Sequence, residues 1–446
     1  MSQTKTNTIF ALFERALGML FSLGTAMLLL RRLSKEDFAA WGLFLLITYF
    51  LDMARSGLIQ NGLVRNLTLT RESPQSYVSL KQAAFLLNIF FTFCSNLILW
   101  LIMDWIADSW NVPQLLGIIP VYFVLSFVQV ILTHFNYIQQ ALHEFKGIFL
   151  ANISSKAAIF CWVVYCYVSG ASVNLFSLAL AMLVGLCVGS MASWYFLQKL
   201  VQPKYFGENS FNQIFHWIKQ LISYGKWVLG TNFSTMLYKN VDKLSLGYLI
   251  GPAAFAVYEA AGKVTQLVEA PSFSIASVVF PKGSERLKEK GPNGIKLLYE
   301  RSVGAILAIV LPFILGILLF PETIMLLFAG DAYLESADIL VITAFFGLLL
   351  PFAVQFGTIL DATGKPHINF AYTFFTAVLN LVLSWYFIQW YGLRGAAWAT
   401  LIGYGVSFVL TQLYLHRHFR INALQAIGYI PEFYVASWKM LVGRKD

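Results

Sequence analysis

Apolar stretches long enough to cross a membrane follow one another along almost the whole chain. A helix needs about 20 apolar residues to span the hydrocarbon of a bilayer. Stretches of this kind are 9–31, 38–60, 81–103, 113–134, 148–169, 174–198, 222–248, 252–279, 300–320, 337–360, 367–390 and 394–416. Only 12% of the 446 residues are charged, whereas soluble domains carry about a quarter. The sequence therefore predicts an all-α integral membrane protein of about twelve transmembrane helices.

The positively charged residues of the connecting segments indicate the orientation. The first apolar run, Ala16–Leu30, ends at Arg31 and Arg32 without a small-residue cleavage site, so we interpret it as a retained span. With the N-terminus in the cytoplasm, the outer loops hold only four basic residues, Arg31, Arg32, Lys35 and Arg394, and the inner loops hold most of the others. The positive-inside rule therefore predicts that both termini are cytoplasmic. The net charge of +9 is explained by these loops and by anionic headgroups, without any need for nucleic acid.

The spans divide into two groups of six. A polar linker, 202–221, separates a predicted N-terminal six-helix bundle (1–201) from a C-terminal one (222–416). A tail, 417–446, follows the last span. Its segment 421–443 mixes aromatic residues with Lys439, which favours an amphipathic helix in the membrane interface. Pro431 and Glu432 argue against a thirteenth span.

The two halves resemble each other at two corresponding places. Residues 33–41 match 250–258 at an offset of 217, and both pieces form the outer turn between the first two spans of a half. Residues 140–145 match 361–366 at an offset of 221, and both join the fourth and fifth spans. Equal orientation of the halves predicts a parallel internal repeat around a central cavity, a plan in which one bundle rocks against the other.

Charged residues inside the predicted spans are unevenly distributed. A charge near the bilayer centre costs roughly 2.5–3.5 kcal/mol on insertion scales, so it normally has a function and a partner. These charges gather in the first two spans of each half, where helical spacing places them in polar stripes. The basic members are Arg15, Arg55, Lys239, Lys243 and Lys263. The acidic members are Glu14, Asp52, Asp242, Glu259 and Glu269.

Two interpretations of these charges remain open. The pairs Asp52–Arg55, Lys239–Asp242 and Glu259–Lys263 lie three or four residues apart, so they can neutralise each other as structural ion pairs. The functional interpretation is a wet cavity whose five bases bind an anionic group such as a phosphate. The five carboxylates would then balance the charge of the bases. Asp52 and Glu269 would either have the same role or titrate as part of coupling to a proton or sodium gradient.

Several classes of function have no sequence support. Each Gly-Lys pair lacks a following Ser or Thr, so there is no Walker A loop, and zinc-protease and serine-hydrolase motifs are missing as well. The four cysteines lie in apolar runs and form no CxxC pair. We therefore expect no catalytic residue, no metal and no bound cofactor. A membrane-bound polysaccharide polymerase or ligase is disfavoured because no large outer loop is present.

Three stretches resemble the polysaccharide-export branch of the multidrug/oligosaccharidyl-lipid/polysaccharide exporter superfamily. The first runs through 224–247 and 251–263, with its Asp242-Lys243 pair, a Gly-Pro turn and a run of small residues that ends at Lys263. The others are 30–39 and 391–399, which resemble the first outer turn of the family and its turn into the twelfth span. The chain departs from the pattern at Ala256, where Gly is frequent, and at Ser34-Lys35, where Gly-Pro is common.

The resemblance implies an O-antigen-type flippase rather than an enzyme. Such a protein would move a polyprenyl-diphosphate-linked oligosaccharide across a bacterial inner membrane, from the cytoplasmic to the periplasmic leaflet, with a polysaccharide polymerase as a partner in the same pathway. The same superfamily leaves two alternatives, a cation-coupled drug exporter and a lipid II flippase. Drug exporters favour carboxylates, whereas bases and acids are equal in number here.

Overall fold

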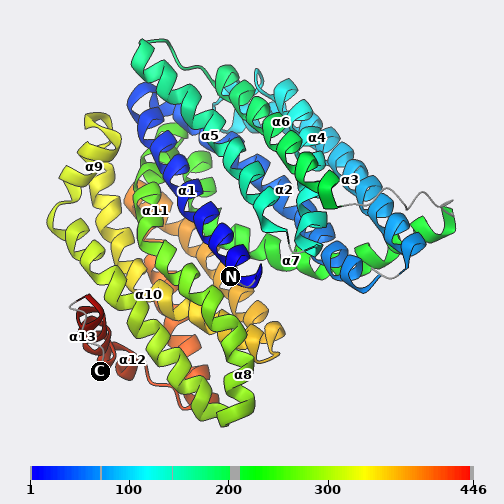
Figure 1. The fold of residues 1–446 in the computed structure, drawn as a ribbon. Coiled ribbons are helices and arrows are strands. Elements are labelled where there is room, and N and C mark those ends of the chain that lie inside the picture. The colour runs from blue at the N-terminus through cyan, green and yellow to red at the C-terminus, as the bar shows by residue number, and fades with distance from the viewer. Residues whose placement is uncertain (1–2, 71–72, 143, 201–210, 442–446) are drawn as a thin grey trace. The chain divides into compact units, whose positions relative to one another are not determined.

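The computed structural model describes residues 3–70, 73–142, 144–200 and 211–441, and helices form nearly all of these ranges (Figure 1). The first six are α1 (Gln3–Arg32), α2 (Lys35–Leu69), α3 (Pro74–Ser109), α4 (Ile119–Ala141), α5 (Phe145–Ser169) and α6 (Leu175–Leu200). The remainder are α7 (Phe211–Leu249), α8 (Pro252–Leu319), α9 (Pro321–Ala329), α10 (Ser336–Ala362), α11 (Pro366–Phe419), α12 (Ala423–Gly428) and α13 (Ile430–Leu441). Two short 3-10 helices, η1 (Pro113–Leu115) and η2 (Asp331–Tyr333), lie in connections.

The twelve predicted spans each fall largely within a helix, and two of these helices contain two spans. The path of α8 breaks at Gly291 and that of α11 breaks at Gly392, where φ is +58° and +59° respectively. Residues with a side chain rarely adopt this conformation, which glycine adopts freely. Each break separates two predicted spans, so α8 holds the eighth and ninth and α11 holds the last two. The prediction of an all-α protein of about twelve spans is confirmed.

Composition distinguishes the seventh and eighth predicted spans from the others. Among the described residues, nine segments are long and apolar enough to cross a membrane. They include α1 to α6, α10, α11 and the part of α8 from Arg286 to Leu319. The first part of α8 and the whole of α7 are not among them, because their polar and charged side chains lower the mean hydropathy. These two segments are the seventh and eighth predicted spans.

Internal contacts divide the chain into two compact units, Met1–Phe233 and Ser234–Asp446. The division falls inside α7 and therefore later than the predicted linker 202–221. Residues 211–221 of that linker are helical, and 202–210 lie outside the described residues. The first part of α7 packs on α2: a Cβ added at Gly225 would lie 1.9 Å from the carbonyl oxygen of Leu58. Only glycine permits this approach of the two helix backbones.

Each unit has its own apolar core. In the first unit, Ile59 and Leu63 of α2 pack with Leu80 of α3, Ile138 of α4 and Leu221 of α7. In the second unit, α8, α10 and α11 meet in a larger cluster that includes Tyr299, Phe352, Ile359, Leu415 and Ile421. Figure 1 shows α9 at the opposite end of this second unit from α12 and α13. The C-terminal tail predicted for 417–446 thus begins within α11 and continues as two helices.

The internal repeat predicted from the sequence is present in the backbone. The α4–α5 and α10–α11 turns are closed by the same two hydrogen bonds at an offset of 221. These bonds are Leu142 N to Ile138 O (3.0 Å), Glu144 N to Gln139 O (2.9 Å), Thr363 N to Ile359 O (2.9 Å) and Lys365 N to Leu360 O (2.8 Å). The outer turns also agree, since Phe38 and Trp41 are buried like Phe255 and Tyr258 at an offset of 217.

Candidate functional site

A buried cluster of three charges lies where α7 meets α8 in the second unit. Glu259 of α8 forms an ion pair with Lys243 of α7 through one oxygen (Nζ to Oε2, 2.7 Å). Its other oxygen forms an ion pair with Lys263 of α8 (Nζ to Oε1, 2.9 Å). The three side chains are only 10–19% exposed. Lys263 follows Glu259 by one helical turn, and the tight turn at Gly251 brings α7 back against α8. One carboxylate therefore serves two ammonium groups, which leaves a local charge of +1.

Asp242 lies beside this cluster but has different partners. Its carboxylate accepts hydrogen bonds from the Tyr258 hydroxyl, from the Thr400 hydroxyl at 3.2 Å and from the backbone N–H of Lys243 at 2.9 Å. These partners come from α7, α8 and α11, so the aspartate joins three helices. One of the two interpretations of the sequence paired Asp242 with Lys239, whereas its hydrogen bonds here come from Tyr258, Thr400 and Lys243.

Lys239 of α7 and Glu269 of α8 lie farther along these two helices from the turn at Gly251. The ammonium of Lys239 sits over the ring of Phe273, 4.7 Å from its centre, in a cation–π contact. Lys239 is exposed and Glu269 is half-buried. Beside them, Tyr404 of α11 packs between Tyr238 of α7 and Phe346 of α10, with ring centres 5.4 and 5.0 Å apart. These three rings lie next to the charged residues of α7.

In the first unit, α2 holds a buried arginine against an exposed acid. The guanidinium of Arg55 and the carboxylate of Asp52 are 2.6 Å apart. The Arg55 side chain is 4% exposed and that of Asp52 is 40% exposed. The Nε of Arg55 is buried and has no hydrogen-bond partner among the described residues. Its own helix therefore satisfies only part of the hydrogen-bonding capacity of this guanidinium.

The two candidates on α1 are placed separately from that pair. Asn152 of α5 donates a hydrogen bond of 2.7 Å to Glu14, and Arg15 is exposed on α1. Lys156 of α5 lies against α1, because a Cβ at Gly18 would come within 2.5 Å of its ammonium nitrogen. The α1–α5 interface thus carries polar groups of its own.

The structure brings together some of the ten predicted site residues. Lys243, Glu259 and Lys263 form one cluster, and Asp52 and Arg55 form one pair. The central cavity predicted from the sequence would lie between the two units, and it stays a prediction. Sequence reasoning missed Tyr258 and Thr400. The repeat gave a signal for Tyr258, which corresponds to Trp41, whereas a contact across 158 residues left no local signal for Thr400.

Together, the two helical units and the apolar length of their helices define a multi-pass membrane protein, and its fold is found among solved transporters. An inward-facing multidrug resistance MATE family transporter of the MOP superfamily aligns with a TM-score of 0.79 and 17% identity, over 90% of this chain and 94% of that one. The lipid II flippase MurJ in an inward closed conformation aligns with a TM-score of 0.67 and 14% identity, over 99% and 93% of the two chains. The fold is therefore that of the MOP superfamily.

The chain belongs to the polysaccharide biosynthesis protein family, whose model matches residues 28–338. This match confirms the resemblance to the polysaccharide-export branch. A probable low-salt glycan biosynthesis flippase of Haloferax volcanii is 28% identical over 197 residues, which are 44% of this chain and 42% of that protein. The matched part of this chain thus spans less than half the length of that relative.

Proposed function

We propose that this protein flips a polyprenyl-diphosphate-linked oligosaccharide, the repeat unit of an O-antigen, capsule or exopolysaccharide, from the cytoplasmic to the periplasmic leaflet by alternating access. The family match and the relative named as a glycan flippase support this assignment. The cargo joins an anionic diphosphate to an apolar tail. A carrier for it needs basic groups inside the membrane, while the tail stays in lipid.

The observation that carries the proposal is the Lys243–Glu259–Lys263 cluster. Two ammonium groups share one carboxylate in a poorly hydrated place, where electrostatic attraction is stronger than in water. An incoming diphosphate can replace Glu259 as the partner of both lysines. The buried Arg55, with its unpartnered Nε, supplies a second basic group in the first unit.

The remaining candidates have subsidiary roles in this proposal. Arg15 and Lys239 are exposed, so they meet the diphosphate or the leaflet headgroups on the way. Glu14, Asp52, Asp242, Glu259 and Glu269 balance the bases when the cargo is absent, and Asp52 or Glu269 titrates if transport is coupled to a proton or sodium gradient. No covalent step takes place and no cofactor is involved.

The setting follows from the same proposal. The protein lies in a bacterial inner membrane with both termini in the cytoplasm, where the basic inner loops contact anionic lipids. A polysaccharide polymerase receives the flipped repeat unit on the other side.

The test is a flipping assay in liposomes with a fluorescent polyprenyl-diphosphate-linked sugar, alongside polysaccharide production in cells. Arg15→Ala, Arg55→Ala and Lys263→Ala are made singly. Lys290→Ala, at an exposed position of α8 next to the break at Gly291, is the matched control for the loss of a positive charge. We expect Lys263→Ala and Arg55→Ala to lower flipping by about tenfold or more, the effect of losing one charge-assisted contact. The control should keep its activity.

Normal polysaccharide levels in all three variants, at equal protein abundance, would show that these bases do not bind the cargo. Cation-driven drug efflux without glycan flipping would indicate the drug-exporter alternative. Flipping of lipid II in place of the glycan carrier would indicate the lipid II alternative.

A further inference from the structure

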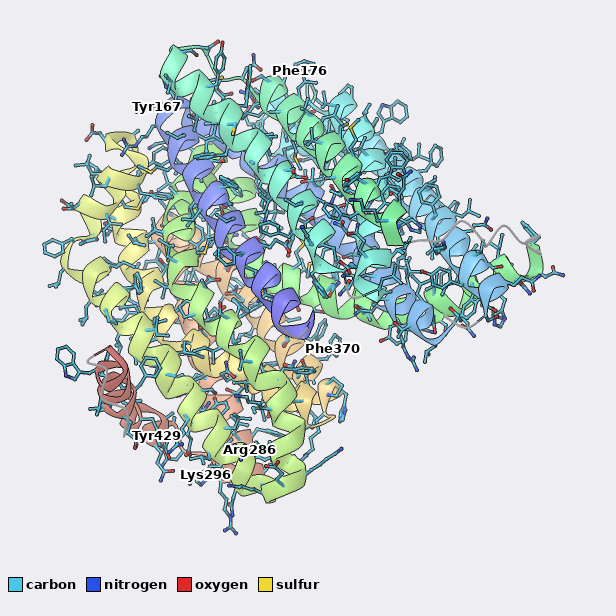
Figure 2. All side chains as sticks on the ribbon, in the orientation of Figure 1. Tyr167, Phe176, Arg286, Lys296, Phe370 and Tyr429 are labelled. Carbon is cyan, nitrogen blue, oxygen red and sulfur yellow. The ribbon has the colours of Figure 1, made fainter. Side chains whose placement is uncertain are left out.

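A polar cleft of about 530 Å³ lies in the second unit, away from the charge cluster. Figure 2 shows two of its lining residues, Lys296 on α8 and Tyr429 beside α13, at the same end of this unit. The full lining is Asn293, Lys296, Leu297, Glu300, Gln425, Gly428, Tyr429 and Glu432. Nothing in the transport proposal uses this cleft.

The walls of the cleft are held in place by specific contacts between α8 and the C-terminal helices. A Cβ at Gly304 would lie 2.7 Å from the carbonyl oxygen of Ala426, so α12 rests directly on α8. The Tyr434 hydroxyl donates to the carbonyl oxygen of Ala308. Glu300 accepts a 2.9 Å hydrogen bond from the backbone N–H of Asn422, where α12 begins. The C-terminal tail is thus part of the fold, and these contacts fix the positions of the walls of the cleft.

Opposite charges alternate along the cleft. The Glu300 side chain is 2% exposed and lies 3.9 Å from the ammonium of Lys296, which is 29% exposed. Glu432 lies 4.0 Å from Arg301, whose guanidinium also covers the Tyr429 ring. Together with Arg301, which pairs with Glu432, the charged side chains at the cleft are two bases and two acids. A group with one negative and one positive charge therefore fits, because it leaves the site neutral.

The residues around the cleft indicate a position at the depth of lipid headgroups. The charged hairpin around Gly291 ends at Arg301, and the apolar stretch from Val303 to Leu319 follows at once. On the other wall, α13 exposes Tyr434, Val435 and Trp438. Tyrosine and tryptophan are enriched at the membrane–water interface, and an amphipathic helix lies in its plane.

We infer that this cleft binds the zwitterionic headgroup of an aminophospholipid such as phosphatidylethanolamine. Lys296 receives the phosphate, because its ammonium has three donors and its ion-pair partner Glu300, at 3.9 Å, lies beyond hydrogen-bond distance. The primary ammonium of the lipid lies between the carboxylates of Glu300 and Glu432. This inference concerns a lipid of the surrounding leaflet and is independent of the transported cargo.

Native mass spectrometry of the full-length protein tests this inference. The delipidated protein is titrated with phosphatidylethanolamine, phosphatidylcholine and phosphatidylglycerol that carry identical acyl chains. We expect tighter retention of one phosphatidylethanolamine than of either other lipid. Lys296→Gln and Glu432→Gln should each weaken that retention by about threefold to tenfold, as expected for a partly exposed charge-assisted contact. Lys290→Gln, in the same hairpin but outside the lining, is the matched control.

Four results would overturn the inference. Equal retention of the three lipids, or unchanged retention in both variants, would show that the cleft does not select a headgroup. Preference for phosphatidylglycerol that is lost in Lys296→Gln would indicate an anionic lipid site. Displacement of phosphatidylethanolamine by a free oligosaccharide would indicate a sugar site. Glu432 is 65% exposed, so its substitution leaves the fold intact.

Discussion

Lys243 and Glu259 lie on successive helices and form an ion pair of 2.7 Å across the α7–α8 turn. The same carboxylate also holds Lys263, at 2.9 Å. Removal of the carboxylate changes the local charge from +1 to +2, whereas removal of one lysine makes the cluster neutral. The acid, rather than either base, is therefore the member on which the stability of the cluster depends.

Glu259→Gln should strongly destabilise the protein. Breaking a buried ion pair by removing one partner costs about 3–5 kcal/mol, because the remaining charge is left uncompensated. The melting temperature in detergent should fall clearly, whatever the effect on transport. The double variant Glu259→Gln/Lys263→Met removes one of the two stranded ammonium groups and should recover part of the loss. A double variant as unstable as the single one would contradict this account of the cluster.

The Asp52–Arg55 pair should respond asymmetrically. Asp52→Asn leaves Arg55 buried and without its counter-charge, whereas Arg55→Gln leaves an acid whose side chain is 40% exposed. We therefore expect Asp52→Asn to lower the melting temperature more than Arg55→Gln does. Equal losses would mean that the two charges are equally well solvated. Transport measured on the same samples separates this stability effect from cargo binding.

The fold was largely predictable from the sequence, because length and polarity of the apolar runs determine where a helix can cross a bilayer. The breaks at Gly291 and Gly392 fall between predicted spans for this reason. The boundary of the first unit was harder to predict. Residues 211–221 are polar enough to resemble a linker, yet Leu221 and Gly225 pack on α2. That contact depends on tertiary packing across the unit.

Gly225→Ala should destabilise the first unit, and Gly230→Ala provides a matched control on the same helix. The added methyl at Gly225 would meet the Leu58 carbonyl at 1.9 Å, whereas at Gly230 no atom of another described element lies within 4 Å of the corresponding position. In a helix interior, replacing glycine by alanine normally stabilises by roughly 0.5–1 kcal/mol. Opposite shifts of the melting temperature are therefore expected. Parallel shifts would show that α7 does not approach α2 this closely.

Tyr258→Phe should weaken the connection between α7, α8 and α11. It removes a hydroxyl that donates to the buried Asp242 carboxylate, leaving the Thr400 hydroxyl and one backbone N–H. Loss of a hydrogen bond to a charged group costs about 1.5–3 kcal/mol. Thermal unfolding in detergent measures the effect. Tyr248→Phe, at a half-exposed position on α7, is the control and should leave stability unchanged.

The candidate site was predictable only in part. Helical spacing correctly paired Asp52 with Arg55 and Glu259 with Lys263, because neighbours on one helix are fixed by geometry. The same rule does not give the hydrogen bonds of Asp242, since Tyr258 and Thr400 donate to it from other helices. Partners from distant segments depend on how the bundle packs, which residue spacing does not encode.

The packing of Gly225 against Leu58 matters for anyone who divides this protein into fragments. A cut placed in the polar segment ahead of Phe211 would strip α2 of the helix that covers it, exposing Leu58 and Leu63 to detergent or lipid. An isolated amino-terminal fragment needs the residues through Phe233 to keep its apolar core closed. Co-expressed fragments cut earlier would have to restore that helix from the other polypeptide.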